Sequence, residues 1–377
     1  MRILLVNWQD LENPHAGGAE IHLFELFGRL AGFGHQVRLV CSGWPGCPPR
    51  ATVRGVEVER HGGRHGFALA GRGAVRRALA ADRYDVVVED VNKLPLYLAG
   101  LTPLPFVVIV PHLFGTTAFE EASWPVASLV VLAERRIPRA YRRAWFHAIS
   151  ESTRDDLVAR GVARERIEVI HPGIDLEWFV PDPSLDRTPE PSFLYVGRLR
   201  RYKGVEVALG ALSIARRSRP ELRLDIAGTG EDRARLEMVA RRLGVEASVR
   251  FHGFVDEESK RRMLRTTWAN VLPSPKEGWG ITVTEAAACG TPSIASDSPG
   301  LRDSVQADRT GLLVPHGDAE ALARRMLDLA SSPDRVRALG MAARRAAERW
   351  SWDDAARATE AHLRRIVAGG KPSDHSN

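Results

Sequence analysis

Short runs of apolar residues alternate along the chain with longer stretches in which apolar residues recur at helical spacing. Apolar runs of this kind are typical of strands that a parallel sheet buries on both faces. They predict strands at 2–6, 37–40, 56–58, 85–88, 106–110, 146–150, 193–196, 222–227, 249–251, 271–272 and 293–296. The clearest helical stretches are at 19–33, 74–81, 205–218 and 232–243, and 43–54 is a connection rich in Gly and Pro. This alternation predicts an α/β protein.

The strand–helix pattern occurs twice, on either side of the proline-rich segment 181–191 (PDPSLDRTPEP). We interpret this segment as a linker between domains. A chain of 377 residues is long enough for two α/β domains. We therefore expect an N-terminal Rossmann-like domain at 1–180 and a C-terminal one at 181–351. A last helix and a disordered tail beginning at Gly369 occupy 352–377.

Composition limits the classes of partner. The chain has 53 basic and 47 acidic residues, a formal net charge of +6. This mild excess suits anionic substrates or an anionic membrane face, and it does not indicate nucleic-acid binding. Cys41, Cys47 and Cys289 lack zinc-site spacing, so we expect no disulfide and no structural metal, as in a reducing cytoplasm. The apolar run at 2–6 is too short for a signal peptide, and no run could span a membrane.

An arginine-rich stretch follows Glu134, with the sequence ERRIPRAYRR. One interpretation is a solvated helix face interrupted by Pro138. The alternative is that the arginines of 135–143 bind anionic headgroups at the inner face of a membrane, or a phosphorylated acceptor. The sequence leaves both interpretations open.

The stretch 271–292 (VLPSPKEGWGITVTEAAACGTP) combines a strand end, a glycine-containing loop and a helix start. Glu277 lies in the loop and Glu285 in the first turns of the helix. The unpaired N–H groups at the helix start attract an anion. Two carboxylates beside such a helix start can hold a ligand that is part polyol and part anion, as a nucleotide sugar is.

Three further segments place polar or flexible residues where predicted strands end, the usual ligand position in open α/β sheets. Gly17 and Gly18 precede the first helix, where backbone can approach a ligand closely. His112 follows the strand at 106–110. Arg198 and Lys203 flank one loop and suit a diphosphate better than a monovalent anion. Taken singly, each could be a turn residue, a structural histidine or a solvated surface charge.

Together these segments resemble glycosyltransferase family 4, a family of retaining enzymes with the GT-B fold. The segment EGWGITVTE resembles the family's acid–seven residues–acid motif, GRLRRYKG its diphosphate-binding segment, and HAGGAE its N-terminal glycine loop. The resemblance implies two Rossmann-like domains facing each other across an interdomain cleft. It implies catalytic roles for Gly17, His112, Arg198, Lys203 and Glu277. It implies donor binding by Gly17, Gly18, Arg198, Lys203, Gly253, Phe254, Val255, Glu277, Gly278, Trp279, Gly280, Ile281, Thr282 and Glu285.

The resemblance also implies the chemistry. A retaining hexosyltransferase would move a sugar from a nucleotide-diphosphate sugar, UDP- or GDP-linked rather than ADP-linked, to a hydroxyl of a glycan or lipid-linked acceptor. Arg198 and Lys203 would stabilise the leaving diphosphate, so neither a metal nor a cofactor is expected. Such an enzyme fits the cytoplasm and a role in cell-envelope glycan synthesis. A nucleotide-sugar epimerase or hydrolase and a non-catalytic nucleotide-sugar-binding protein remain alternatives. An NAD enzyme is disfavoured because Gly228-x-Gly230 lacks the third glycine of that fingerprint.

Overall fold

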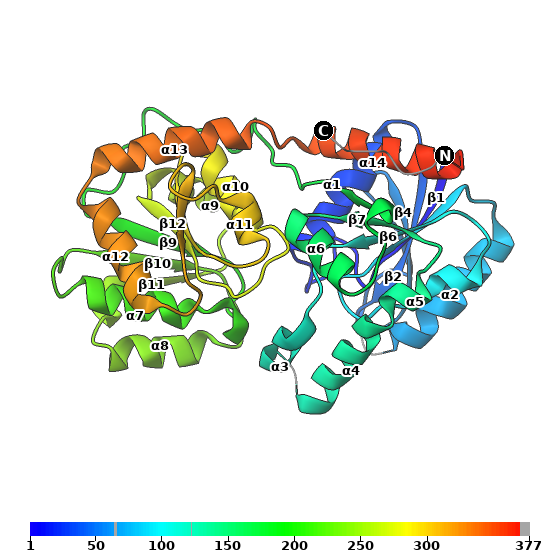
Figure 1. Cartoon of the computed structure of the whole chain (residues 1–377), viewed down its shortest axis with the longest axis horizontal. Helices are drawn as coiled ribbons and strands as arrows, with labels where there is room; N and C mark the ends of the chain where they lie inside the picture. Colours follow the sequence, from blue (N-terminus) through cyan, green and yellow to red (C-terminus); the bar gives the residue numbers. More distant parts are fainter. Residues whose placement is uncertain (64–65, 122, 370–377) are drawn as a thin grey trace. The chain divides into compact units, whose positions relative to one another are not determined.

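The computed structural model describes residues 1–63, 66–121 and 123–369, which form two compact units (Figure 1). Unit 1 comprises Met1–Gly173 and the segment that begins at Trp352, and unit 2 comprises Ile174–Ser351. The first junction thus follows Gly173, whereas the sequence places it at 180/181. Residues 370–377 of the predicted tail lie outside the described residues.

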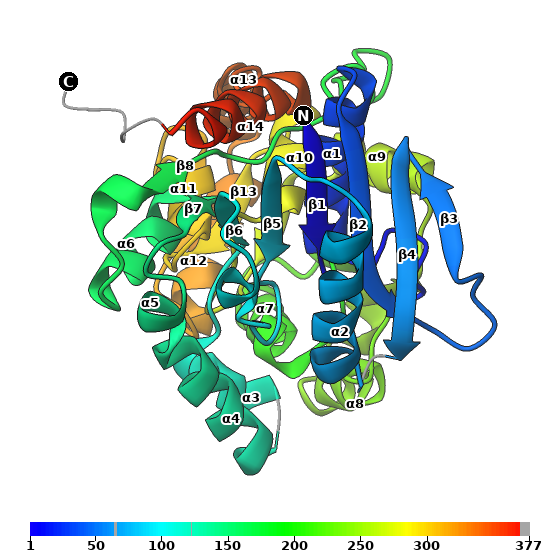
Figure 2. The ribbon, with the colours of Figure 1, turned by 90° about the vertical axis from the view of Figure 1, so that its right-hand side faces the viewer.

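Unit 1 contains a sheet in the order β3-β4-β2-β1-β5-β6-β7-β8, whose strands Figure 2 shows side by side. All neighbouring strands pair in parallel except β3 and β4. Its strands are β1 (Arg2–Val6), β2 (Gln36–Gly43), β3 (Arg50–Val53), β4 (Val56–Gly63), β5 (Val86–Asp90), β6 (Phe106–Val110), β7 (Trp145–Ala148) and β8 (Ile167–Val169). Its helices are α1 (Gly18–Gly32), α2 (Phe67–Ala81), α3 (Ala118–Glu121), α4 (Trp124–Arg135), α5 (Ile137–Ala140), α6 (Glu151–Ala159) and α14 (Trp352–Val367), with 3-10 turns η1 (Leu98–Leu101), η2 (Gly115–Thr117) and η3 (Arg164–Arg166).

Alternate residues of the parallel strands face two hydrophobic cores. Ile3 and Leu5 of β1 pack with α1 and α14 on one face. Leu4 and Val6 pack with α2 and the α5–α6 region on the other. The continuous apolar runs of the sequence follow from this burial on both faces.

Strand β3 was not predicted, because the sequence of 43–54 was interpreted as an irregular connection. Arg50–Val53 pairs antiparallel with β4. Arg54 and Gly55, at the turn between the strands, both have positive φ, 48° and 80°. Such a turn closes a tight hairpin. The short strand is mostly exposed, so it carries little of the hydrophobic pattern that identifies buried strands.

Unit 2 contains a parallel sheet in the order β11-β10-β9-β12-β13-β14. Its strands are β9 (Ser192–Val196), β10 (Arg223–Ala227), β11 (Val249–Gly253), β12 (Ala269–Leu272), β13 (Ser293–Ser296) and β14 (Gly311–Val314). Its helices are α7 (Val205–Ala215), α8 (Arg233–Arg242), α9 (Glu257–Thr266), α10 (Ile281–Ala288), α11 (Leu301–Ser304), α12 (Ala319–Ala330) and α13 (Pro333–Ala347), with 3-10 turns η4 (Arg201–Lys203) and η5 (Glu246–Ser248).

The proline-rich segment 181–191 belongs to unit 2 and does not lie between the units. Arg187 donates hydrogen bonds to the carbonyl oxygen of Gly290 at 2.8 Å and to Oγ1 of Thr291 at 3.1 Å. The indole of Trp268 donates to the carbonyl oxygen of Thr188 at 2.9 Å. These long-range hydrogen bonds attach the segment to the residues that directly precede β12 and β13.

Each sheet reverses its strand order at one point. In unit 1 the reversal lies between β1 and β5, and in unit 2 between β9 and β12. Both orders contain the doubly wound Rossmann arrangement, in which ligands bind beyond the carboxyl ends of the strands at the reversal. The loops after β1, β5, β9 and β12 are therefore where a ligand site is expected.

Candidate active site

The loops that follow β9 and β12 bring Lys203 and Glu277 together. Nζ of Lys203 lies 2.6 Å from Oε1 of Glu277, and each side chain is 16% exposed. Burial by itself would lower the pKa of Lys203, but the Glu277 carboxylate and the phenol of Tyr202 raise it above its ordinary value. The ammonium group therefore stays charged at the point where the strand order reverses. It has three N–H donors, of which Glu277 uses one.

Close backbone contacts hold this arrangement in place. Gly204 has φ +68°, and a Cβ there would lie 2.7 Å from the carbonyl oxygen of Pro273. A Cβ on Gly300, in the loop after β13, would lie 2.1 Å from the carbonyl oxygen of Glu277. Only glycine allows such approaches. The buried hydroxyl of Ser298 donates to the carbonyl oxygen of Ser274 at 3.0 Å, which links the loops after β12 and β13. Neither serine was singled out in the sequence.

Arg198 lies on the same loop as Lys203 and is exposed. Its carbonyl oxygen accepts a hydrogen bond from the buried hydroxyl of Tyr195 at 3.0 Å, which holds the loop after β9. Within the described residues, the Arg198 guanidinium has no ion-pair partner. The loop therefore presents the exposed Arg198 guanidinium together with the Lys203 ammonium, which is paired with Glu277.

Gly228 and Gly230 allow the loop after β10 to pack closely against the loop after β9. A Cβ on Gly228 would lie 1.9 Å from the carbonyl oxygen of Gly197, and one on Gly230 would lie 2.1 Å from that of Leu199. These contacts place the loop after β10 directly against the loop after β9. The pair thus supports the loop that carries Arg198.

Helix α10 begins at Ile281, directly after Gly280, which has φ +85°. Gly280 provides no side-chain cap, so the N–H groups of Ile281 and Thr282 are positioned to bind an anion. The loop residue Trp279 is 2% exposed, and its ring lies edge to face with Trp350 at 5.2 Å between centroids. The Trp279 side chain is therefore part of the core, and only the backbone of Gly278 to Gly280 is left for ligand contact.

Glu285 on α10 is buried and forms an ion pair that the sequence did not suggest. Its Oε1 lies 2.7 Å from Nζ of Lys260 on α9, whereas its Oε2 is buried without a partner among the described residues. Burial raises the pKa of Glu285, and Lys260 opposes that rise. Lys260 lies within the charged run EESKRRMLRT, where spacing does not distinguish it from solvated residues. Oε2 of Glu285 is the atom available to accept a hydrogen bond from a ligand hydroxyl.

The turn after β11 is formed by Gly253, Phe254 and Val255. Gly253 has φ +72°, and its carbonyl oxygen accepts a hydrogen bond from the N–H of Gly228 at 2.7 Å. The Phe254 side chain is 83% exposed. The turn is thus fixed through its backbone to the loop after β10.

In unit 1, the predicted glycine loop lies at the start of α1. The N–H of Gly17 donates to Oε2 of Glu20 at 2.8 Å, and Oε1 of Glu20 accepts from Nδ2 of Asn92 at 3.1 Å. Glu20 is 4% exposed. This carboxylate ties the loop after β1 to the end of β5, across the reversal of strand order. Gly18 is exposed as the first residue of α1.

His112 lies in the loop after β6, and its ring contacts Phe114 at 4.9 Å between centroids. Glu134 holds this loop: its carboxylate accepts the N–H of Phe114 at 2.6 Å and that of Gly115 at 2.8 Å, and pairs with Arg160 at 3.3 Å. Glu134 is the acid that opens the arginine-rich stretch. Its burial and role depend on tertiary packing, so no sequence pattern indicated them.

The arginine-rich stretch divides into buried and exposed positions. Ile137 and Tyr141 are fully buried, and the Tyr141 hydroxyl donates to Oε1 of Glu89 at 2.7 Å. All arginines of 135–143 are exposed. The stretch is therefore a packed segment with a cationic outer face.

Within residues 1–63, 66–121 and 123–369, no group of three or more His, Cys, Asp or Glu side chains has the arrangement of a metal site. No helix in the same ranges combines the length and hydropathy that crossing a membrane requires.

Comparisons with known proteins identify the class. Residues 178–346 match the model "Glycosyl transferases group 1", and residues 16–178 match "Glycosyltransferase Family 4". Sucrose-phosphate synthase from Thermosynechococcus elongatus superposes with a TM-score of 0.84 at 23% identity, over 98% of this chain and 100% of that one. Anabaena HepE, solved with UDP and glucose, superposes with a TM-score of 0.74 at 18% identity, over 97% and 99% of the two chains. The two Rossmann-like units and these likenesses define a GT-B fold.

Sequence relatives give the family. The chain is 30% identical to D-inositol 3-phosphate glycosyltransferase of Streptomyces avermitilis, over 97% of this chain and 89% of the relative. It is 29% identical to the enzyme of the same name from Streptomyces coelicolor, over 95% and 89%. The chain belongs to glycosyltransferase family 4 and is a glycosyltransferase.

Proposed function

We propose that the chain transfers a hexosyl group from a nucleotide-diphosphate sugar to an acceptor hydroxyl, with retention of anomeric configuration and without a metal ion. The observation that carries the proposal is the Lys203–Glu277 pair, 2.6 Å apart at the reversal of strand order in unit 2. A charged amine held there can stabilise the negative charge that develops on a departing diphosphate. Arg198, exposed on the same loop, adds a bidentate donor for the second phosphate.

The neighbouring groups have separate roles in this proposal. The start of α10 after Gly280 binds a phosphate oxygen through backbone N–H groups. Glu277 accepts hydrogen bonds from sugar hydroxyls, and Oε2 of Glu285 accepts one from the ribose. The backbone of Gly253 to Val255 contacts the base, which we propose is the uracil or guanine of a UDP or GDP donor. No cofactor takes part.

In unit 1 we propose that Gly17, Gly18 and His112 contact the acceptor and the transferred sugar. The bond from Gly17 to Glu20 fixes the glycine loop before substrate binds, and Glu134 does the same for the His112 loop. Such preorganisation lowers the entropy cost of bringing reactants together. In the proposed same-face reaction, the sugar–phosphate bond breaks, the acceptor oxygen bonds to the anomeric carbon, and a donor phosphate oxygen takes the acceptor proton.

A coupled assay distinguishes this reaction from its alternatives. Release of nucleoside diphosphate is measured for UDP-, GDP- and ADP-sugars, with and without acceptors that include D-inositol 3-phosphate and lipid-linked glycans. Release that requires an acceptor supports transfer. Release of nucleoside diphosphate without an acceptor indicates a hydrolase. Isomerisation of the sugar indicates an epimerase, and binding of the nucleotide sugar without turnover indicates a non-catalytic protein.

Two further measurements test the mechanism. The coupling constant of the anomeric proton, measured by NMR, gives the anomeric configuration of the product. This configuration should be the same as in the donor sugar, and an inverted product would refute retention. Activity should persist in excess EDTA. Arg198→Ala should lose about 10²-fold in rate, the usual effect of removing one donor to a developing anion. Arg201→Ala, an exposed arginine of the same loop, is the matched control and should retain activity.

We also propose that unit 1 contacts the inner face of the membrane in the cytoplasm, where lipid-linked or cell-envelope glycan precursors would be acceptors. Helix α4 exposes four large apolar side chains: Trp124 (76%), Val126 (50%), Leu129 (55%) and Leu132 (53%). The exposed arginines of 135–143 follow directly, and α4 projects from the body of unit 1 (Figures 1 and 2). An apolar face beside cations suits an anionic bilayer surface.

Vesicle sedimentation tests the membrane contact. The chain should sediment with vesicles of phosphatidylglycerol and phosphatidylcholine, less so at high salt, and Leu129→Gln with Leu132→Gln should weaken this binding. Leu69→Gln on α2 removes another leucine, 84% exposed, and should change nothing. Equal sedimentation of all three proteins would refute the contact.

A further inference from the structure

Unit 2 contains a second cationic site, separate from the residues assigned to the donor. A hollow of about 250 Å³ is lined by Gln306, Arg309, Thr310, Ala342, Arg345, Ala346 and Arg349. Its walls are α13 and the turn that leads into β14. Three of its seven lining residues are arginines.

The position of this hollow distinguishes it from the proposed donor site. The turn of Gln306 to Thr310 precedes Gly311, the first residue of β14, and so lies at the amino edge of the sheet. Lys203 and Glu277 follow the carboxyl ends of β9 and β12. Because all neighbouring strands of this sheet are parallel, the two sites lie at opposite edges.

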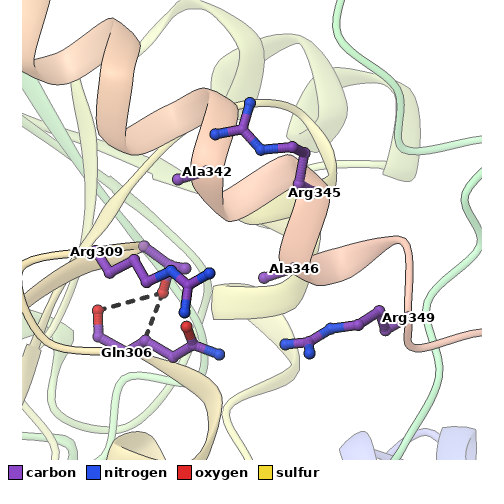
Figure 3. Close-up of a pocket in the computed structure, with 7 residues that line it drawn as sticks. Gln306, Arg309, Ala342, Arg345, Ala346 and Arg349 are labelled. Carbon is purple, nitrogen blue, oxygen red and sulfur yellow. Dashed lines mark hydrogen bonds between the residues drawn. The ribbon is translucent and has the colours of Figure 1, made fainter.

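Figure 3 shows how the side chains point. The guanidinium groups of Arg309 and Arg349 and the side-chain amide of Gln306 extend toward the same space below Ala346, whereas Arg345 extends along the helix past Ala342. Arg309 and Arg349 therefore form the cationic pair, and Arg345 lies at the rim.

The turn that carries Arg309 is fixed. The N–H of Gln306 donates to Oγ1 of Thr310 at 2.9 Å, and the N–H of Thr310 donates back to the carbonyl oxygen of Gln306 at 2.9 Å. Thr310 is 7% exposed. The cation of Arg309 is thus presented from an ordered turn.

The charges in the hollow are unbalanced. Among the described residues, none of the three lining arginines has an ion-pair partner. Nearby acids are already engaged: Asp308 lies 3.5 Å from Arg335, and Glu348 lies 3.0 Å from Arg344. A position at the C-terminal end of α13 accounts for a cation at Arg349, since the helix dipole favours one there. It does not account for Arg309, which comes from another segment.

We propose that this hollow binds the phosphate group of a soluble small molecule. Two guanidinium groups facing one space repel each other, and a phosphate removes that repulsion by accepting planar, bidentate hydrogen bonds from both. The amide of Gln306 adds a neutral donor. The apolar lining consists of Ala342 and Ala346, which offer nothing to insert into a bilayer, so a free phosphate compound is favoured over a lipid headgroup. Because the hollow lies at the sheet edge opposite Lys203 and Glu277, the bound phosphate takes no part in transfer.

Residue-resolved arginine modification tests the site on the full chain. The protein reacts with phenylglyoxal in sodium phosphate or in sodium chloride of equal ionic strength, and the modified peptides are quantified by mass spectrometry. At a phosphate concentration ten times Kd, Arg309 and Arg349 should react about tenfold more slowly. Arg345 at the rim and Arg337, paired with Asp334 at 3.0 Å on the same helix, are controls whose rates should not change.

The outcomes separate this site from the donor site. Protection of Arg198 without protection of Arg309 and Arg349 would overturn the second site and leave the proposed donor site standing. Equal protection of every exposed arginine would show only ionic screening and would also overturn it. Protection by phosphatidylglycerol vesicles but not by free phosphate would overturn the soluble ligand. In support, R309Q alone should abolish the protection of Arg349 by phosphate in the same assay, while transfer without added phosphate continues at the rate of the unmodified chain.

Discussion

The Lys203–Glu277 pair gives a quantitative test of the candidate site. At the 2.6 Å separation, with an effective dielectric constant of about 20, the attraction between the charges is about 6 kcal/mol. Desolvation of both groups offsets much of it. Removing one partner leaves the other charged in a site where its side chain is only 16% exposed, at a cost of about 3 kcal/mol.

We therefore expect Lys203→Met and Glu277→Gln each to lower the free energy of unfolding of unit 2 by about 3 kcal/mol. The double variant leaves no unpaired charge and should lose about 3 kcal/mol in total, so the coupling energy is about 3 kcal/mol. For a unit of this size, each single loss corresponds to a Tm decrease of about 6–12 °C.

Differential scanning calorimetry of the four proteins measures this coupling, and the transfer assay at a temperature where all are folded measures function. Lys203→Met should lose at least about 10²-fold in turnover, since about 3 kcal/mol of leaving-group stabilisation is removed. Additive losses of stability in the double variant would refute the ion pair. Full activity of folded Lys203→Met would refute its role in transfer.

Two further predictions concern stability. His22 and His362 are buried in unit 1, where burial lowers the pKa of each to about 3. The unfolded chain binds these protons from about pH 6.5 downward, so the free energy of unfolding of unit 1 should fall by about 1.4 kcal/mol per pH unit per histidine between pH 6.5 and 3. In urea titrations, the free energy of unfolding of His362→Leu should depend less steeply on pH. An unchanged slope would contradict the prediction. Gly204 and Gly244 both have φ +68°, but only a Cβ on Gly204 meets a neighbour, the Pro273 carbonyl oxygen at 2.7 Å. Gly244→Ala should therefore lower the free energy of unfolding by about 1 kcal/mol, and Gly204→Ala should lower it by at least about 2 kcal/mol more. Equal losses in denaturant unfolding would refute the close contact at Gly204.

Much of the architecture could be predicted from the pattern of apolar runs. Strand β6 is apolar throughout and β1 is apolar after Arg2, and the predicted bounds of both strands are confirmed. Strand β3 was missed because an exposed edge strand needs no apolar run. The prediction that 181–191 is a linker between domains is wrong, because proline content does not indicate what a segment packs against.

The candidate site shows the same division. The glycine loops, the acids Glu277 and Glu285, and the cations Arg198 and Lys203 could be predicted because they follow predicted strands. The ends of those strands can be located from the apolar runs. The sequence did not show that Lys203 contacts Glu277, that Lys260 contacts Glu285, or that Glu134 holds the His112 loop. The paired residues are 20 positions apart for Phe114 and Glu134, 25 for Lys260 and Glu285, and 74 for Lys203 and Glu277.

The sequence by itself determined the class of protein: two α/β units with family motifs at the ends of their strands. Local rules suffice for this, because strand burial, turns and helix starts depend on neighbouring residues. The tertiary structure decided which charges are paired and which are available. It placed the Trp279 side chain in the core. Within the part of the chain that the structure describes, it also left one oxygen of buried Glu285 without a partner, and Arg309 and Arg349 without ion pairs around one hollow. Charge pairing depends on distances between segments that are remote in sequence, and only the folded chain sets those distances.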